Sequence, residues 1–213
     1  TNAKEIISFG YQENSDFKVS DIEIDIINNS TNFCLRFDGK KEKFFINGAS
    51  HHSPLNAALS VATAMYCGCS LSNIKERLKF IDLPERRLAI SNSLKGSILI
   101  DDSYNSNPAS LKNAVDSLEG FKRKKICILG DMKELGSNSQ KIHQEMYEYI
   151  SERVDQILCI GDEWSTCSPN EKQDLSIFEN RDDLYSHLIS LIDKKTILLV
   201  KGSRSTRMDL LAD

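Results

Sequence analysis

The chain of 213 residues is long enough for one large domain or for a domain and part of another. Its 40% hydrophobic and 27% charged residues are ordinary for a globular protein, and its net charge of −4 does not suggest a nucleic-acid-binding surface. We find no signal peptide and no apolar stretch near the roughly 20 residues of a membrane helix. The six cysteines have neither disulfide-framework nor metal-site spacing. We therefore expect a reduced, cytoplasmic protein that binds neither nucleic acid nor membrane.

The first part of the sequence predicts strands followed by helices. The expected strands are Ile6–Gly10, Ile22–Ile27, Asn32–Phe37 and Glu42–Ile46. The last two alternate in polarity around the turn Asp38–Lys41, which is typical of a β-hairpin. A helix rich in small residues over Pro54–Tyr66 ends at Gly68. A second helix begins near Ser70 and ends before Pro84.

We place a domain boundary near Arg87–Leu88, because regular alternation of strands and helices begins there. The predicted strands are Leu88–Ser91, Ile98–Ile100, Ile126–Leu129, Ile157–Ile160 and Ile197–Val200, and the predicted helices are Pro108–Leu118, Ser139–Arg153 and Arg181–Ile192. This order indicates βαβ units with right-handed crossovers in a mostly parallel sheet. The first two strands are candidates for a leading hairpin. The prediction is an α/β, Rossmann-like domain over 88–213, preceded by an incomplete α/β unit over 1–87.

The most informative motif, Asp-Asp-Ser-Tyr-Asn-Ser-Asn-Pro over 101–108, follows the predicted strand Ile98–Ile100. Open α/β sheets bind ligands where a strand's carboxyl end meets a helix N-terminus. Asn107 as helix cap and Pro108 at the first helical position account for the end of the motif structurally. A cap does not account for two adjacent acids, a tyrosine and a further asparagine. We therefore favour a binding role.

Two further motifs follow later strands, Leu-Gly-Asp-Met-Lys-Glu-Leu-Gly over 129–136 and Lys-Gly-Ser-Arg over 201–204. In this order and spacing the three motifs resemble the C-terminal half of Mur ligases, and the resemblance runs from Ile7–Gly10 to Arg204. It implies that 1–87 is the end of the central ATPase domain and 88–213 the C-terminal domain. The implied reaction joins D-alanyl-D-alanine to UDP-N-acetylmuramoyl-tripeptide through an acyl phosphate in peptidoglycan biosynthesis.

The resemblance also implies ATP and Mg²⁺ as cofactors and a monomer at full length. The sequence contains no Gly-x-x-x-x-Gly-Lys-Ser/Thr loop, so we expect the phosphate loop and most magnesium ligands in a part upstream of this chain. The chain alone is then expected to be inactive. The alternative is a non-catalytic Rossmann-like module that binds a nucleotide or a peptide. The sequence has no Gly-x-Gly-x-x-Gly after any strand, which argues against an NAD module.

The resemblance assigns nucleotide contacts to the end of the first unit and the start of the second. Arg86 matches an arginine that contacts the ATP phosphates, although Glu85 stands where the family usually has glycine and Arg87 follows. Asp102 matches the acid that accepts hydrogen bonds from the ribose hydroxyls. Tyr104, Asn105 and Asn107 match positions that line the nucleotide and the domain junction.

The adenine side of the expected nucleotide site is His52 and Asn56. They match a family pattern in which a histidine and two asparagines precede an alanine-rich helix, and an amide can both donate to and accept from a base edge. Ser53 replaces the first of those asparagines. Asn56 as an ordinary residue at the helix N-terminus is the alternative.

The resemblance places the D-alanyl-D-alanine site near Asp131, Met132, Lys201, Ser203 and Arg204. The last three end the final strand beside a predicted last helix, whose N-terminus would favour an anion such as the dipeptide carboxylate. The alternative is that Lys201 and Arg204 form structural ion pairs with Asp131 or Glu134. His143 matches a helix histidine of the family, and a lone histidine on an amphipathic helix is more often packed than catalytic. We assign no catalytic residue and no metal ligand in this chain.

Overall fold

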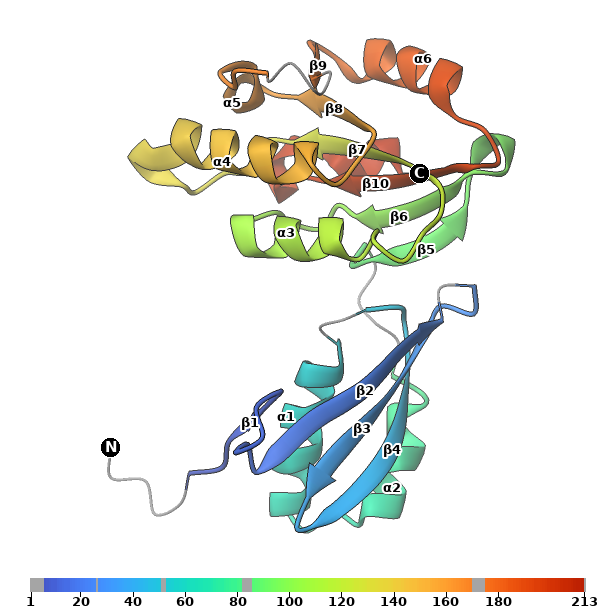
Figure 1. Ribbon diagram of the computed structural model, residues 1–213, viewed down its shortest axis with the longest axis vertical. Coiled ribbons are helices and arrows are strands. Elements are labelled where there is room, and N and C mark those ends of the chain that lie inside the picture. Colours follow the sequence, from blue (N-terminus) through green and yellow to red (C-terminus); the bar gives the residue numbers. More distant parts are fainter. Residues whose placement is uncertain (1–5, 26, 51–52, 82–85, 170–174, 213) are drawn as a thin grey trace. The chain divides into compact units, whose positions relative to one another are not determined.

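The computed structural model describes residues 6–25, 27–50, 53–81, 86–169 and 175–212 (Figure 1). The chain forms two compact units, Thr1–Leu83 and Pro84–Asp213. This division falls just before the expected boundary near Arg87–Leu88, and it assigns Arg86 and Arg87 to the C-terminal unit.

The N-terminal unit is a four-stranded sheet with two helices. The strands β1 (Phe9–Gly10), β2 (Phe17–Asp25), β3 (Ser30–Phe37) and β4 (Lys40–Asn47) lie in chain order, and the helices are α1 (Ser53–Tyr66) and α2 (Leu71–Leu78). β1 is parallel to β2, whereas β2, β3 and β4 are antiparallel. The predicted β3–β4 hairpin is confirmed. Its turn is Asp38-Gly39, with φ of 48° and 70°, the conformation that favours Asp-Gly in two-residue hairpins.

The core of this unit consists of aromatic side chains from the sheet and small side chains from α1. Phe17 stacks on Phe37 with ring centroids 5.0 Å apart. Since Phe17 and Val19 alternate with less buried residues, β2 begins well before the expected Ile22. On α1 the buried residues include Ala57, Ala58, Val61 and Ala62. Side chains this small let a helix approach a sheet closely, as the composition of this segment predicts.

The C-terminal unit is a six-stranded sheet with helices on both faces. Its strands are β5 (Ala89–Asn92), β6 (Ile98–Asp102), β7 (Lys124–Gly130), β8 (Gln156–Ile160), β9 (Leu175–Phe178) and β10 (Thr196–Lys201), in the order β5-β6-β10-β7-β8-β9. Only the pair β5–β6 is antiparallel. The mostly parallel α/β fold and the leading hairpin are thus confirmed. The short edge strand β9 is not predicted by the sequence pattern.

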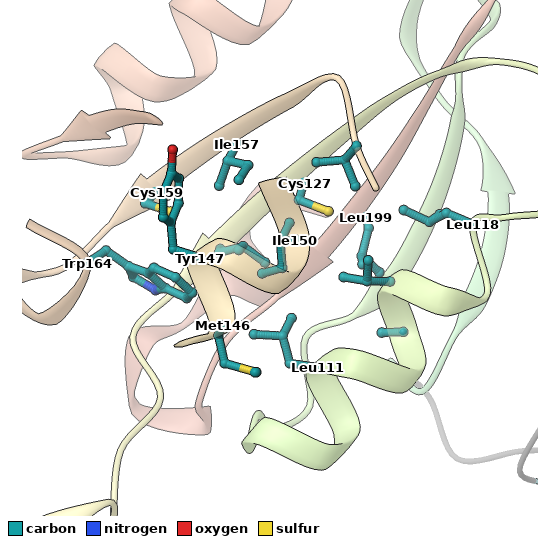
Figure 2. Packing of buried hydrophobic residues seen from close by; sticks show 14 of the residues in the cluster. Leu111, Leu118, Cys127, Met146, Tyr147, Ile150, Ile157, Cys159, Trp164 and Leu199 are labelled. Atoms are coloured by element: carbon teal, nitrogen blue, oxygen red, sulfur yellow. The ribbon is translucent and has the colours of Figure 1, made fainter. Parts of the chain in front are cut away.

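Helices α3 (Pro108–Asp116), α4 (Ser139–Ser151) and the short α5 (Asp162–Ser165) pack on one face of this sheet, and α6 (Arg181–Leu191) packs on the other. In Figure 2, Leu111 of α3, Ile150 of α4 and Trp164 of α5 lie in one cluster with Cys127 and Leu199 of the strands. Because both faces are covered, β7 and β10 contain the continuous apolar runs Ile126–Leu129 and Ile197–Val200.

The predicted final helix is wrong for the described residues. After β10 the chain forms two short 3₁₀ turns, Arg204–Thr206 and Met208–Leu211. Arg207 between them has a left-handed φ of 51°, which interrupts helical geometry. The helix N-terminus that was expected to attract an anion here is therefore missing from the described part of the chain. Among the described residues no helix is long and apolar enough to cross a bilayer.

Candidate functional site

The three sequence motifs meet at one edge of the C-terminal sheet. β10 lies between β6 and β7, and the register sets Lys201 beside Asp102 on one side and beside Leu129 on the other. All three strands are parallel, so the segments that follow them leave the sheet at the same end. This places residues 101–108, 129–136 and 201–204 together, although they are far apart along the chain.

Asp102 and Lys201 form a buried ion pair at the centre of this edge. The Lys201 ammonium lies 2.5 Å from Asp102 Oδ2 and donates to the backbone oxygen of Asn105 over 2.8 Å. The Leu88 N–H donates to Asp102 Oδ1 over 3.1 Å. The side chain of Lys201 is 2% exposed and that of Asp102 is 13% exposed. Burial is the largest influence on both groups, and it raises the pKa of Asp102 and lowers the pKa of Lys201.

This geometry identifies the partners of Lys201. Its ion-pair partner is Asp102, so the alternative that Lys201 pairs with Asp131 or Glu134 is wrong. Its ammonium contacts both the Asp102 carboxylate and the Asn105 backbone oxygen. Lys201 therefore holds the segment after β6 against β10, which the sequence could not show because Lys201 and Asp102 are 99 positions apart.

Arg86 and Arg87 have different surroundings. Arg86 Nη1 lies 2.6 Å from Oδ2 of the buried Asp209. Its backbone has a φ of 61°, in the region that favours glycine. The guanidinium carbon of Arg87 lies 4.5 Å from the centre of the Tyr104 ring, and that of Arg204 lies 5.9 Å from the same ring. Two exposed cations therefore flank an exposed tyrosine next to the Asp102–Lys201 pair.

The positive φ of Arg86 bears on which of the two arginines matches the family's arginine. The family has glycine before its phosphate-contacting arginine, and the glycine-like conformation belongs to Arg86. This conformation is our reason for considering Arg87 beside Arg86 as the candidate for the family arginine. No sequence pattern indicates Asp209, the buried carboxylate that pairs with Arg86.

The remaining nucleotide candidates are placed as follows. Asn107 caps α3: its Oδ1 accepts from the Ser110 N–H over 2.8 Å, and its own N–H donates to Ser110 Oγ over 3.0 Å. The structural explanation of Asn107 is thus confirmed. Asn105 contributes its backbone oxygen to Lys201. Asn56 is exposed on α1 in the N-terminal unit, and His52 lies outside the described residues.

The candidates after β7 point into the protein. Met132 is completely buried and Asp131 is 3% exposed. Asp131 Oδ1 accepts from the N–H groups of Glu163 and Trp164 over 3.2 Å and 3.4 Å, and its Oδ2 receives Lys133 Nζ at 2.9 Å. Asp131 therefore caps the first turn of α5 from a neighbouring strand end.

Ser203 connects the three segments at the strand ends. Its Oγ accepts from the Lys133 N–H over 2.8 Å and lies 3.4 Å from the Ser106 oxygen, and its own N–H donates to the Asp131 oxygen over 3.1 Å. The expected cluster of Asp131, Ser203 and Arg204 is therefore brought together, although its first member is internal. In the described ranges we find no group of three or more His, Cys, Asp or Glu side chains that could hold a metal ion.

A profile of the Mur ligase, glutamate ligase domain matches residues 86–204. The chain belongs to the Mur ligase family. This Mur ligase chain is 34% identical over 165 residues to the UDP-N-acetylmuramoyl-tripeptide–D-alanyl-D-alanine ligase of Haemophilus influenzae. The match covers 74% of this chain and 36% of that protein.

Solved structures agree with the family assignment. MurF from Acinetobacter baumannii superposes with a TM-score of 0.84 at 29% identity, covering 98% of this chain and 46% of the other. MurF from Thermotoga maritima, solved in complex with ADP, has the same fold, with a TM-score of 0.82 at 23% identity over 96% of this chain and 46% of the other. This Mur ligase chain thus spans less than half the length of the proteins it matches.

Proposed function

We propose that the chain supplies part of an ATP-dependent ligase that joins D-alanyl-D-alanine to UDP-N-acetylmuramoyl-tripeptide. In this reaction the tripeptide carboxylate attacks the γ-phosphorus of ATP, ADP leaves, the dipeptide amine attacks the acyl phosphate and phosphate departs. Catalysis of this kind relies on positioning and on neutralising phosphate charge. The main support for this proposal is that Asp102, Arg87 and Tyr104 lie together at this edge of the sheet, in a chain similar to ligases named for this reaction.

We assign the nucleotide side of this edge to Asp102 and Arg87. Asp102 Oδ1 accepts from the Leu88 N–H and Oδ2 accepts from Lys201. A carboxylate oxygen can accept two hydrogen bonds, so a ribose diol can still bind. The exposed Arg87 guanidinium can bind phosphate oxygens bidentately. Tyr104 and Asn105 are the other residues of this edge that we assign to the nucleotide. In this proposal Asn56 and His52 serve the adenine.

We assign the dipeptide side to the segment around Ser203 and Arg204, with the backbone at Asp131 and Met132 as its inner wall. Arg204 is the exposed cation of this segment, and it replaces Lys201 as the partner of the dipeptide carboxylate. When bound, Mg²⁺ would neutralise phosphate charge. We expect its ligands mainly in a part of the enzyme upstream of this chain.

The proposal includes a cytoplasmic monomer. The six cysteines are free, and four of them are buried, which suits a reducing compartment. The competing proposal is a non-catalytic module that binds a nucleotide or a peptide.

The test is isotope-traced ligation of D-alanyl-D-alanine to UDP-N-acetylmuramoyl-tripeptide with ATP and Mg²⁺. It uses the full-length product of the gene that encodes this chain, and the chain alone. We expect ligation by the full-length protein, loss in Asp102→Asn, and about a 10- to 100-fold lower kcat/KM for ATP in Arg87→Gln, the range for a lost charge-assisted contact.

Arg77→Gln, at an exposed arginine of α2, is the matched control and should retain activity. Arg86→Gln separates the two arginines, because it should lower stability through Asp209 more than it changes the KM for ATP. A full-length protein that binds ATP but forms no product with either a diaminopimelate or a lysine tripeptide would favour the binding module.

A further inference from the structure

His143 is a buried polar side chain that has no role in the proposed chemistry. It lies on α4, is completely buried, and meets the Trp164 indole edge to face with ring centroids 4.8 Å apart and an interplanar angle of 87°. Packing alone could be supplied by an aromatic hydrocarbon ring. The two ring nitrogens need a separate explanation, because buried polar atoms in proteins nearly always have a hydrogen-bond partner.

Both nitrogens of His143 are bonded to backbone groups. The Met132 N–H donates to Nε2 over 3.1 Å, and Nδ1 lies 2.9 Å from the backbone oxygen of Ser139. A carbonyl oxygen only accepts and an amide N–H only donates, so the ring must be neutral with its hydrogen on Nδ1. His143 is thus an acceptor aimed at the segment that follows β7.

The next amide of that segment is held from another element. The Lys133 N–H donates to Ser203 Oγ over 2.8 Å, and Ser203 belongs to the segment after β10. Two consecutive amides are therefore fixed by side chains, one from α4 and one from the proposed dipeptide side. If the first amide is released, the second loses its orientation toward Ser203.

We propose that His143 is a positioning residue for the dipeptide side of the site. Through the Met132 N–H it fixes the β7–α4 segment, and through the Lys133 N–H it orients the Ser203 hydroxyl. This inference rests on the proposed function for its kinetic consequence. Its structural consequence, protection of the Met132 and Lys133 amides, can be measured without any ligation.

The test compares variants of the full-length protein that keep or remove the acceptor. His143→Phe keeps the ring and removes Nε2, whereas His143→Gln can bring an amide oxygen to the Nε2 position. We expect His143→Phe to raise the KM for D-alanyl-D-alanine about tenfold, as for one lost neutral hydrogen bond, with the KM for ATP within twofold. His143→Gln should restore the KM to within threefold of the original protein.

Hydrogen exchange of a peptide containing Met132 and Lys133 should be faster in His143→Phe and near normal in His143→Gln. The matched control is His187→Phe, at an exposed histidine of α6 whose ring lies beside that of Phe178. If His143→Phe does not fold, His143→Asn replaces it, because the shorter amide does not reach the Nε2 position.

Unchanged exchange and unchanged KM for the dipeptide in the acceptor-free variant would overturn the inference. So would a His143→Gln protein as impaired as His143→Phe, or an equal rise in KM for both substrates. Absence of ligation in the original full-length protein would instead refute the proposed function, and the exchange measurement would still decide the role of His143.

Discussion

Replacing Lys201 by Met would leave the Asp102 carboxylate buried without its cation. The pair is separated by 2.5 Å, and the Lys201 side chain is 2% exposed. Removing one partner of a buried ion pair costs about 3–5 kcal/mol, because the remaining charge lacks both water and a counter-ion. The Asn105 oxygen also loses its donor. We expect Lys201→Met to lower the free energy of unfolding by about 3–5 kcal/mol, or Tm by about 10–20 °C for a domain of this size.

Urea unfolding, followed by tryptophan fluorescence, measures this loss of stability in the C-terminal unit, where both residues lie. The chain has one tryptophan, Trp164, and it is completely buried in the C-terminal unit. Lys141→Met is the matched control, since Lys141 is 78% exposed and meets Glu145 only at 3.8 Å. A surface pair of this kind contributes less than about 1 kcal/mol.

The double variant Lys201→Met, Asp102→Asn completes the cycle. Removing both charges leaves neither one buried and unpaired, so the double variant should be less destabilised than the sum of the single variants by at least about 2 kcal/mol. Additive effects, or a Lys201→Met protein within about 1 kcal/mol of the Lys141→Met control, would refute the reasoning.

Three further predictions concern the same unit. Gly161 has a φ of 128°, and a Cβ there would lie 2.3 Å from the Asp131 carboxyl. Gly161→Ala should therefore lower the free energy of unfolding in urea by more than about 2 kcal/mol. A loss no larger than that of the control Gly120→Ala, at an exposed glycine, would contradict the close contact. Asn107→Ala removes the α3 cap and should lower the free energy of unfolding by about 1 kcal/mol in the same assay. Asn107→Asp should keep most of that stability, because an aspartate can also cap the helix. Burial raises the pKa of the Cys127 thiol from 9.0 to about 12. The unfolded chain therefore loses this proton first, and stability falls as pH rises above about 9, by up to about 1.4 kcal/mol per pH unit. The difference in unfolding free energy between the original protein and Cys127→Ala, measured from pH 8 to 10.5, should show this slope, and a pH-independent difference would contradict it.

Much of the secondary structure could be predicted because its signals are local. The alternation of Asn32–Phe37 and Glu42–Ile46 around Asp-Gly, and the Asn-Pro start of α3, depend on residues that are neighbours in the chain. β9 and α5 escaped prediction because each is only four residues long and contributes few side chains to the core.

The sequence by itself determined the α/β class, the alternation of strands and helices, and the three polar motifs at strand ends. Hydrophobic periodicity and turn residues carry that information within a few positions. Only the tertiary structure decided that β10 lies between β6 and β7, and therefore that Lys201 pairs with Asp102 rather than with Asp131. Strand order joins residues 99 positions apart, and no local pattern records which buried charge will meet which.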